Sequence, residues 1–464
     1  MSELSVGTIL AATAGRLVSG RPDRALGGVS IDSRTLNPGE LFVAIVGPRH
    51  DGHDFLGDAA QRGAAAALVS EDVPPPPGLD LVRVADTTQA LAALARHVRA
   101  QTEVPVVAIT GSAGKTTTKE MTARLLESRG AVLRTQGNLN NQYGLPLMLL
   151  RLKREHQFAV FELGMSAAGE LRHLSGIAAP DVAVITNVAP VHLEFFASVD
   201  AIADAKAEIL EGLRPNGVAV LNGDDPRVRR IGEERSGEVI FFGHDRGFGV
   251  SAERWRGTVH GMRFDLRLGG QTIDIALPLS GPHFVMNFLA AAAVAHRLGV
   301  TPEAIALAAT EMRPAAHRGE VLRLGEGVTL IDDSYNSNPA AVEAAVTSLT
   351  LAPTGRRVAF LGDMLELGTT SRELHVETGR RVGARVDVLV GVGPLSHALL
   401  EGAHESGART QALHHFADSM QAAAAAPQIV QPGDAVLVKG SRGVHMEAVV
   451  DTLRARFGAN GGAH

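Results

Sequence analysis

The stretch VPVVAITGSAGKTTTKEMTARLLESR, residues 104–129, decides the fold of this chain. A β-branched run at 106–109 leads into a loop bounded by Gly111 and Gly114. Lys115 and three threonines then open a segment whose apolar residues have helical spacing. We therefore predict a strand, a phosphate-binding loop and a helix, because backbone N–H groups and the positive end of a helix would face an anion there.

In such a loop the lysine reaches the β- and γ-phosphates of a nucleotide, and the next hydroxyl can bind Mg²⁺. The predicted ligand of this loop is ATP or GTP. The usual pattern has a glycine five residues before Gly114, but this chain has Ile109, so the loop is a compressed G-x-x-G-K-T-T form. The alternative is a glycine-rich turn with a solvated lysine, which the flanking strand and helix disfavour. The predicted binding residues here are Gly111, Ser112, Ala113, Gly114, Lys115, Thr116 and Thr117.

Composition indicates a multidomain α/β protein. The 464 residues exceed what one core serves, and 45% are hydrophobic but only 4% aromatic. The net charge is −6 and no long basic run occurs, so we expect no nucleic-acid partner. Cysteine is absent, which excludes disulfides and fits a reducing compartment.

Neither the N-terminus nor the most apolar stretch of the sequence suggests a membrane protein. The N-terminus lacks a basic segment followed by an apolar one, so we do not predict a signal peptide. The most apolar stretch, 284–295, is shorter than the ~20 residues of a membrane span. We expect a soluble, cytoplasmic protein without membrane insertion.

Three domains are predicted: a small N-terminal α/β domain (1–103), a central P-loop parallel-sheet domain (104–317) and a C-terminal Rossmann-like domain (318–464). In the first, strands alternate with turns that carry Ser33 and Arg34, among other polar residues. Loops held by strands often bind ligands. Ordinary surface turns are an equally good interpretation of this segment.

Polar residues follow the strands predicted in the central domain. The loop 135–147 carries Asn138 and Asn140, which could bind a sugar or phosphate or simply form a turn. Glu162 lies inside an apolar strand predicted at 159–163, just before Gly164, which favours a Mg²⁺ ligand over a salt-bridged core glutamate. His192 follows the next strand, 181–186, and would reach the same edge of the sheet. By itself it fits a surface histidine better.

Two helices follow in this domain. The first is predicted over 198–210, and nothing in the spacing distinguishes Lys206 from a solvated lysine. The second starts at Pro282 and stops at Gly299. Its Asn287 could pair with adenine through N6 and N7, or it could be a polar core residue.

The third domain opens with Arg318, at a joint from which an arginine can reach phosphoryl charge. Its strands at 329–331, 357–361 and 435–438 each end in a polar loop: DDSYNSNP, GDMLELG and KGSRG. This pattern predicts a second doubly wound sheet with a site at its carboxyl edge.

These motifs resemble the ATP-dependent Mur ligases of bacterial cell-wall synthesis, a family that also includes relatives adding glutamate to folates. TGSAGKTTTK, FELG, NVAPVHL with DAKAEIL, GPHFVMN, and HRGE with DDSYNSNP occur in the family's order, over almost the whole chain. DSYNSNP, GDMLELG and the early DSRTLNPGELFVAIVGPRHDGHDF are similar to the branch that adds D-alanyl-D-alanine. The D-N-P-R loop of the preceding ligase is absent, and Phe284 stands where the family often has asparagine.

The resemblance implies a role for each candidate residue. Thr116 and Glu162 would bind one Mg²⁺; His192 and a Lys206 carbamoylated by CO₂ would bind a second. Asn287 would recognise adenine, Asp333 the ribose and Arg318 the phosphates. The implied substrate contacts are Ser33 and Arg34 on the UDP-sugar, and Asn138 and Asn140 on the nucleotide-sugar peptide. The implied catalytic residues are Lys115, His192, Lys206 and Arg318.

The implied reaction joins D-alanyl-D-alanine to UDP-N-acetylmuramoyl-tripeptide through an acyl phosphate, at the expense of ATP. The N-terminal domain would bind the UDP-sugar, the central domain ATP, and the C-terminal domain the amine. A sister ligase with another amine, or a folate-type ligase, is the main alternative. A GTPase-type switch is a second alternative, but it should carry an N-K-x-D motif, which is missing here. A third alternative is a non-catalytic nucleotide-binding scaffold, in which replacing Glu162 or Lys206 by alanine would affect nothing beyond affinity.

Overall fold

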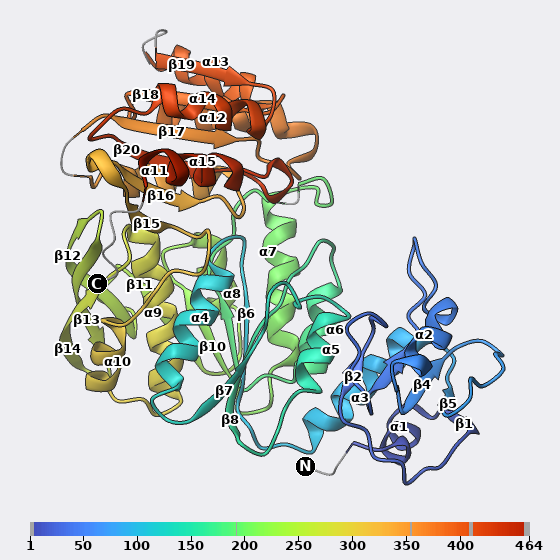
Figure 1. The fold of residues 1–464 in the computed structure, drawn as a ribbon. Coiled ribbons are helices and arrows are strands. Elements are labelled where there is room, and N and C mark those ends of the chain that lie inside the picture. The colour runs from blue at the N-terminus through green and yellow to red at the C-terminus, as the bar shows by residue number, and fades with distance from the viewer. Residues whose placement is uncertain (1–3, 192, 353–354, 408–411, 459–464) are drawn as a thin grey trace. The chain divides into compact units, whose positions relative to one another are not determined.

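The computed structural model describes residues 4–191, 193–352, 355–407 and 412–458. It confirms the predicted α/β class, with three separate sheets (Figure 1). The chain packs into two compact units. One comprises residues up to 109 with 129–183 and 208–218, and the other comprises 110–128, 184–207 and 219 onward.

The N-terminal sheet has five strands in the order β1-β5-β4-β3-β2, parallel except for the β1–β5 pair. Alternate residues of β3 face opposite cores. Leu41 and Val43 pack with α1 and α3, whereas Phe42 packs with α2. The elements are α1 (Val6–Thr13), β1 (Arg16–Ser19), β2 (Val29–Ser30), β3 (Leu41–Val43), η1 (Gly52–Phe55), α2 (Leu56–Gln61), β4 (Ala66–Val69), β5 (Asp80–Arg83) and α3 (Thr87–Ala100).

The central sheet has nine strands in the order β14-β13-β12-β11-β10-β9-β6-β8-β7. The pairs β7–β8, β6–β8, β10–β11 and β11–β12 are parallel, and β12, β13 and β14 continue as antiparallel hairpins. The strands are β6 (Val106–Thr110), β7 (Ala131–Arg134), β8 (His156–Glu162), β9 (Val182–Ile185), β10 (Val218–Asn222), β11 (Val239–Gly243), β12 (Val250–Thr258), β13 (Gly261–Leu268) and β14 (Gln271–Leu277).

Helices connect these strands, and α4 packs directly against α9. The helix predicted over 198–210 is shorter than expected, because α7 ends at Ala207 and the chain tightens into the 3₁₀ turn η2. The elements are α4 (Lys115–Leu126), α5 (Gly144–Leu149), α6 (Glu170–Ala178), α7 (Val199–Ala207), η2 (Glu208–Gly212), α8 (Pro226–Glu233), α9 (Pro282–Arg297) and α10 (Pro302–Ala309).

The C-terminal sheet has six strands in the order β15-β16-β20-β17-β18-β19, parallel except for the β15–β16 pair. Val358 and Phe360 of β17 pack with α14 and α15, whereas Ala359 and Leu361 pack with α11, α12 and α13. Helices therefore cover both faces, as predicted. The elements are β15 (Glu320–Arg323), η3 (Gly325–Gly327), β16 (Thr329–Asp333), α11 (Pro339–Leu349), β17 (Arg357–Gly362), η4 (Gly368–Thr370), α12 (Ser371–Gly383), β18 (Val388–Val392), α13 (Ser396–Glu405), β19 (Leu413–Phe416), α14 (Ser419–Ile429), β20 (Ala435–Lys439), η6 (Arg442–Val444) and α15 (Glu447–Phe457).

This topology places the three predicted polar loops side by side, because β16, β20 and β17 are neighbours and run parallel. One boundary differs from the prediction. Asp332 and Asp333 belong to β16 and pair in register with Val438 and Lys439, so they do not form an acidic turn.

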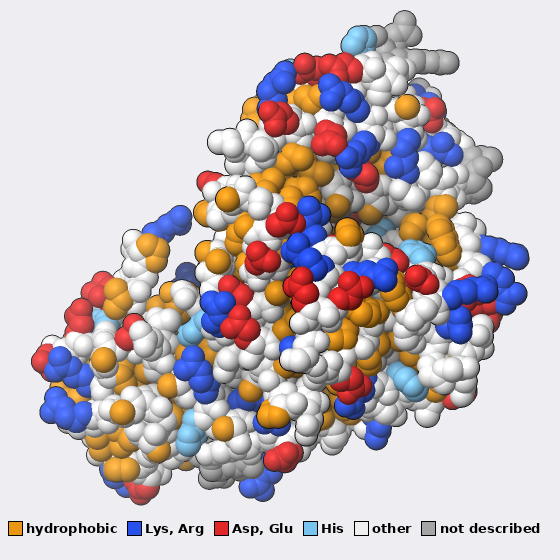
Figure 2. Space-filling view, turned by 180° about the vertical axis from the view of Figure 1, so that it is seen from behind, with side chains coloured by type: hydrophobic (Ala, Val, Ile, Leu, Met, Phe, Trp, Pro, Cys, Tyr) orange, Lys and Arg blue, Asp and Glu red, His pale blue; other side chains and the backbone are white. Residues whose placement is uncertain are grey.

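Surface charges of both signs are interspersed on the face shown in Figure 2. Elsewhere among the described residues, surface charges form ion pairs such as Arg172 with Glu211 and Arg380 with Glu405. Among the helices of the described residues, none has both the length and the apolar character that a bilayer crossing requires.

Candidate functional site

The phosphate loop has the backbone that its glycines permit. Gly111 has φ 150°, and a Cβ there would lie 1.8 Å from the Thr186 hydroxyl. Gly114 has φ 82°, and a Cβ there would lie 2.3 Å from Oδ1 of Asn287. Only glycine fits both positions. The predicted strand, loop and helix are confirmed, with β6 leading into α4 (Figure 1).

The start of α4 is suited to an anion. No side chain caps the helix at Gly114, and no acidic residue lies in its first turn. The Lys115 ammonium folds back over the loop and donates a hydrogen bond to the carbonyl of Gly111 at 2.7 Å. Lys115, Thr116 and Thr117 are only partly buried. The helix N-terminus therefore presents positive charge at an accessible loop.

The segment after β9 holds the phosphate loop in place. Oδ1 of Asn187 accepts a hydrogen bond from the Ala113 amide at 2.9 Å, and its Nδ2 donates to the Ala113 carbonyl at 3.1 Å. The Thr186 hydroxyl donates to the same carbonyl at 2.6 Å. Ser112 bonds the backbone of Ala189 in both directions. Sequence reasoning did not include Thr186 or Asn187 among the site residues; their position directly after a buried strand was the available signal.

Lys206 is buried, with 2% of its surface exposed, so its interpretation as a solvated lysine is wrong. It lies on α7, and its flanking alanines leave room for neighbouring elements to enclose it. Burial, and then the positive charge of Lys115, hold the pKa of Lys206 well below its usual value. A lysine in this environment has a neutral, nucleophilic amine at a pH where a surface lysine is charged.

Glu162 and Asn140 lie together. Glu162 is the last residue of β8 and is buried, and Nδ2 of Asn140 donates to its carboxylate at 3.0 Å. Asn138 is exposed, and its carbonyl accepts the Asn140 amide at 2.8 Å. The sequence analysis had assigned Glu162 to a metal site and Asn138 and Asn140 to the substrate. His192, the other predicted metal ligand from a strand end, lies outside the described residues.

Asn287 is buried on α9 beneath the phosphate loop. Its Oδ1 accepts a hydrogen bond from the Thr118 hydroxyl at 3.4 Å and lies next to Gly114. Its burial and its hydrogen bond to Thr118 are consistent with Asn287 being a polar core residue. The role of Asn287 in reading adenine stays a prediction.

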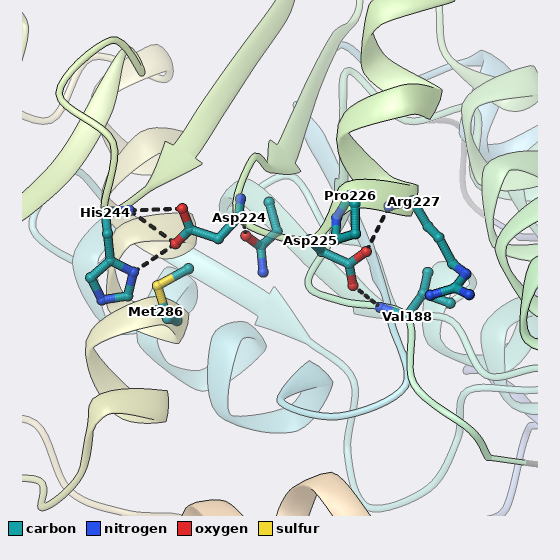
Figure 3. Close-up of a pocket in the computed structure, with 8 residues that line it drawn as sticks. Val188, Asp224, Asp225, Pro226, Arg227, His244 and Met286 are labelled. Carbon is teal, nitrogen blue, oxygen red and sulfur yellow. Dashed lines mark hydrogen bonds and ion pairs between the residues drawn. The ribbon is translucent and has the colours of Figure 1, made fainter.

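A pocket of about 480 Å³ opens at the carboxyl ends of β10 and β11 (Figure 3). Asp225 accepts the amides of Val188 and Arg227 at 2.7 and 3.0 Å, which ties the segment after β9 to α8. Asp224 accepts Nδ1 of His244 at 2.6 Å, and this bond raises the pKa of His244. The pocket is lined by Val188, Asn222, Asp224, Asp225, Pro226, Arg227, His244 and Met286.

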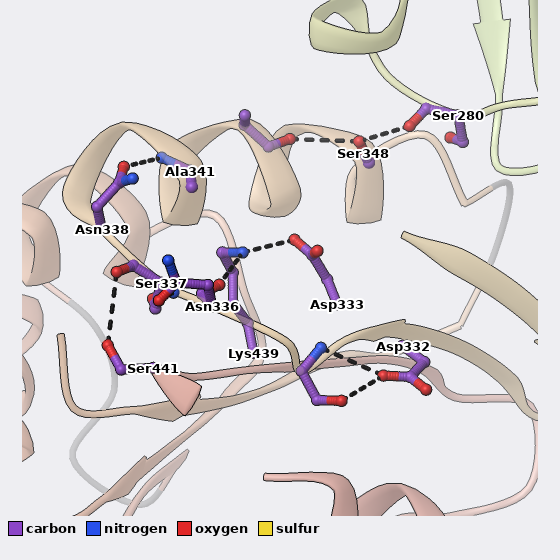
Figure 4. Close-up of polar contacts among 12 residues, drawn as sticks. Ser280, Asp332, Asp333, Asn336, Ser337, Asn338, Ala341, Ser348, Lys439 and Ser441 are labelled. Carbon is purple, nitrogen blue, oxygen red and sulfur yellow. Dashed lines mark hydrogen bonds and ion pairs between the residues drawn. The ribbon is translucent and has the colours of Figure 1, made fainter. Parts of the chain in front are cut away.

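At the edge of the C-terminal sheet, Lys439 donates to Asp333 at 2.7 Å and to the Asn336 carbonyl at 2.9 Å (Figure 4). Burial raises the pKa of Asp333, although Lys439 and Arg318 oppose this shift. The guanidinium of Arg318 lies 4.2 Å from the centre of the Tyr335 ring. The predicted residues Arg318 and Asp333 thus lie on one edge, and Lys439 is a partner that sequence reasoning missed.

In the N-terminal sheet, Ser33 is buried, whereas the Arg34 side chain is 84% exposed. Arg34 makes a bidentate pair with Asp32 at 2.8 and 2.9 Å, and its hydrogen bond lowers the pKa of Asp32. His53, in η1, donates from Nδ1 to Asp51 and accepts the Ser70 amide at Nε2. Both of its ring nitrogens are therefore occupied, which disfavours a metal site there.

Models of one protein family match most of the chain. The "Mur ligase family, catalytic domain" matches residues 26–99, the "Mur ligase middle domain" 109–295, and the "Mur ligase, glutamate ligase domain" 317–442. The UDP-N-acetylmuramoyl-tripeptide–D-alanyl-D-alanine ligase of Escherichia coli strain K12 is 39% identical, over 93% of this chain and 94% of the relative. The chain belongs to the Mur ligase family.

Solved structures agree with this assignment. A crystal structure of MurF from Acinetobacter baumannii has a TM-score of 0.91 and 33% identity, and covers 98% of this Mur ligase and 99% of that chain. The MurF ligase from Thermotoga maritima, solved in complex with ADP, has a TM-score of 0.83 and 31% identity, with 93% and 97% coverage.

In this Mur ligase, the range matched by the middle domain carries the phosphate loop, Asn187, Lys206 and Asn287. The range matched by the glutamate ligase domain carries Arg318, Asp333 and Lys439.

Proposed function

We propose that this Mur ligase joins D-alanyl-D-alanine to UDP-N-acetylmuramoyl-tripeptide in peptidoglycan synthesis, giving UDP-N-acetylmuramoyl-pentapeptide, ADP and phosphate. The observation that carries this function is an accessible phosphate loop in a chain that aligns along 93% of its length with a ligase named for that reaction. The ADP bound by the Thermotoga maritima relative supports ATP as the nucleotide.

The chemistry needs charge neutralisation, because a carboxylate is a poor electrophile. ATP would first convert the terminal carboxylate of the tripeptide into an acyl phosphate, and the dipeptide amine would then displace phosphate through a tetrahedral intermediate. Lys115, already held over the phosphate loop, would neutralise charge on the phosphoryl group. Arg318 would do the same from the C-terminal sheet.

The donor set around this chemistry suits Mg²⁺, which prefers hard oxygen ligands. Thr116, Glu162, His192 and a carbamoylated Lys206 are the proposed ligands, and two ions are expected. When bound, Mg²⁺ would supply charge neutralisation at the phosphates and polarise the reacting oxygens. Asn140 would orient the Glu162 carboxylate through its hydrogen bond.

Carbamoylation of Lys206 is supported by its environment. Its buried amine, with a lowered pKa, is available as the neutral nucleophile. Attack of that amine on CO₂ forms an N–C bond and releases one proton, which leaves a carbamate anion. The product would replace a buried neutral amine by an anionic oxygen ligand, which the positive charge of Lys115 would stabilise.

The remaining roles follow the family. Asn287 would recognise adenine, Asp333 would bind the ribose, and Ser33 and Arg34 would bind the UDP-sugar end. Asn138 and Asn140 would contact the nucleotide-sugar peptide. We also propose domain boundaries at 1–103, 104–317 and 318–464, and a cytoplasmic location.

Phosphate release tests the function. Purified protein with Mg·ATP and UDP-N-acetylmuramoyl-tripeptide should release phosphate only when D-alanyl-D-alanine is added, with a nucleotide-pentapeptide identified by mass. Stimulation by a single amino acid instead would assign the chain to a sister ligase. No stimulation by any amine, or equal release with and without the dipeptide, would refute the ligase function.

A further inference from the structure

His317 holds a partly exposed imidazole against a buried carboxylate. Its Nδ1 lies 2.8 Å from Oδ2 of Asp332. The Asp332 side chain is fully buried, whereas 38% of the His317 side chain is exposed. Because a carboxylate only accepts hydrogen bonds, Nδ1 carries the ring proton and the neutral imidazole has a free lone pair on Nε2. Within the part of the chain that the structure describes, no residue hydrogen-bonds this Nε2.

The Asp332 carboxylate is itself held in one orientation. Its other oxygen, Oδ1, accepts the Ser334 hydroxyl at 2.6 Å and the Ser334 amide at 3.2 Å (Figure 4). The carboxylate therefore cannot turn away from His317 without breaking both bonds to Ser334. A histidine whose tautomer and direction are fixed by an orienting carboxylate has the geometry of a catalytic base.

The backbone around His317 is held at the same place. His317 has φ 59°, in the left-handed region that residues other than glycine rarely adopt. The Tyr335 amide donates to the His317 carbonyl at 3.2 Å, and the Gly319 amide donates to the Asp332 carbonyl at 2.9 Å. Such backbone conformations persist only where neighbouring contacts enforce them, and they cluster at functional sites. These contacts fix His317 at the end of β16, directly before Arg318 in the chain.

The proposed reaction contains a proton transfer that the residues assigned so far do not perform. The dipeptide amine is an ammonium ion near neutral pH, and it must lose a proton before it can attack the acyl phosphate. Lys115 and Arg318 are cations, and the oxygens of Glu162 and of a carbamoylated Lys206 would be bound to Mg²⁺. Histidine is the side chain that exchanges a proton most readily near neutral pH.

Two other histidines of the same compact unit are less suited to this step. His375 is buried, and its Nε2 already accepts the Met364 amide at 3.0 Å. Burial, and then Lys439, lower the pKa of His283 to about 4, which makes it a weak base. The charged groups next to the His317–Asp332 pair are Arg318 and the Asp333–Lys439 ion pair at the same strand end.

We propose that His317 is the general base of the amide-forming step, in which its Nε2 accepts a proton from the dipeptide ammonium. The freed lone pair attacks the carbonyl carbon of the acyl phosphate and forms the C–N bond. The C–O bond to the phosphate then breaks, and the phosphate leaves with the electron pair and takes the second amine proton, while the imidazolium returns its proton to solvent. This inference rests on the proposed function. Asp332 is a positioning residue, because it acts through His317.

Two nucleophiles test this inference. Hydroxylamine is uncharged at neutral pH, so it attacks an acyl phosphate without a base and gives a hydroxamate. With Mg·ATP and UDP-N-acetylmuramoyl-tripeptide, His317→Gln should lower kcat for D-alanyl-D-alanine by at least about 100-fold, the usual contribution of a general base. Hydroxamate formation and the KM of ATP should stay within about two-fold of the wild type. The deficit with the dipeptide should shrink as the pH rises toward the range in which its amine loses its own proton.

His445→Gln is the matched control, because His445 also has a left-handed backbone, with φ 58°, and a carboxylate 3.4 Å from Nδ1, that of Glu447. It should leave both nucleophiles unaffected. Added imidazole should restore dipeptide ligation in His317→Ala, since the exposed side chain leaves a space that solvent can reach.

Asp332→Asn tests the orienting carboxylate. Because Ser334 donates to one oxygen, an amide at this position would turn its NH₂ group toward Nδ1 and place the ring proton on Nε2. Dipeptide ligation should therefore fall by at least about ten-fold, with hydroxamate formation retained.

The outcomes separate the inference from the proposed function. A wild type that forms neither the hydroxamate nor the pentapeptide refutes the ligase function and this inference together. If the wild type ligates the dipeptide but His317→Gln does so equally well, or loses both nucleophiles equally, only the inference fails. Failure of imidazole to restore His317→Ala also counts against it. If His317→Gln does not fold, Asp332→Asn decides by the same comparison of nucleophiles.

Discussion

Removing the Asn187 carboxamide should weaken ATP binding without unfolding the protein. Asn187→Ala deletes two partly buried hydrogen bonds to Ala113, at 2.9 and 3.1 Å, and leaves the Ala113 amide without this partner. At about 1 kcal/mol each, the loss is about 2 kcal/mol, or about 30-fold in affinity if all of it falls on ordering the loop. Titration calorimetry with Mg·ATP measures this directly.

A second variant, Asn187→Asp, tests whether added negative charge at this position weakens ATP binding further. Asn187→Asp keeps the acceptor for the Ala113 amide but turns a carboxylate oxygen toward the Ala113 carbonyl and adds negative charge beside the phosphates. It should bind ATP more weakly than Asn187→Ala. Asp86→Ala is the control, because it also removes two backbone hydrogen bonds, from the cap of α3, and should lower stability by about 1 kcal/mol with unchanged ATP affinity. ATP affinity within two-fold of the wild type in Asn187→Ala would refute the reasoning.

Three further predictions concern buried ionisable side chains. Lys206→Met should abolish ligation while preserving the fold, and the wild type should lose activity when CO₂ is removed and regain it with bicarbonate; activity indifferent to CO₂ contradicts a carbamate. Lys439→Met should lower the free energy of unfolding in urea by about 3 kcal/mol, because it leaves the Asp333 carboxylate without its ion-pair partner. The double variant Lys439→Met with Asp333→Asn should recover part of this loss, and an unchanged urea midpoint in Lys439→Met would argue against the ion pair. Burial, and then Lys439, lower the pKa of His283 to about 4, so protons bind the unfolded state first. Stability should fall as pH drops from about 6.5 to about 4, by at most about 1.4 kcal/mol per pH unit from this group, and His283→Leu should flatten that slope in urea titrations; parallel curves exclude the effect.

Local sequence predicted much of the fold. The stretch 104–129 combines β-branched residues, bounding glycines and helical spacing. Each of these signals determines the backbone conformation of residues only a few positions away in the sequence. The polar loops after 329–331, 357–361 and 435–438 were predictable for the same reason. Their convergence on one edge also followed, because parallel strands end on the same side of a sheet.

The candidate site was predictable only in part. Lys115 and Glu162 stand out, since a lysine after a glycine loop and a carboxylate in an apolar strand are unusual in any context. Lys206 and Asn187 do not stand out. Alanine-flanked lysines are common on helix surfaces, and an asparagine after a strand is common in turns.

The sequence by itself determined which segments form strands, helices and phosphate-binding backbone, because those preferences arise from steric limits and periodicity along the chain. Only the tertiary structure decided which polar groups share an environment. Asp333 and Lys439, separated by 106 positions, form an ion pair in which Lys439 is buried, and Lys206 is enclosed beside Lys115. The reason is physical: burial and charge depend on whatever packs around a side chain, and most of those neighbours come from distant parts of the chain.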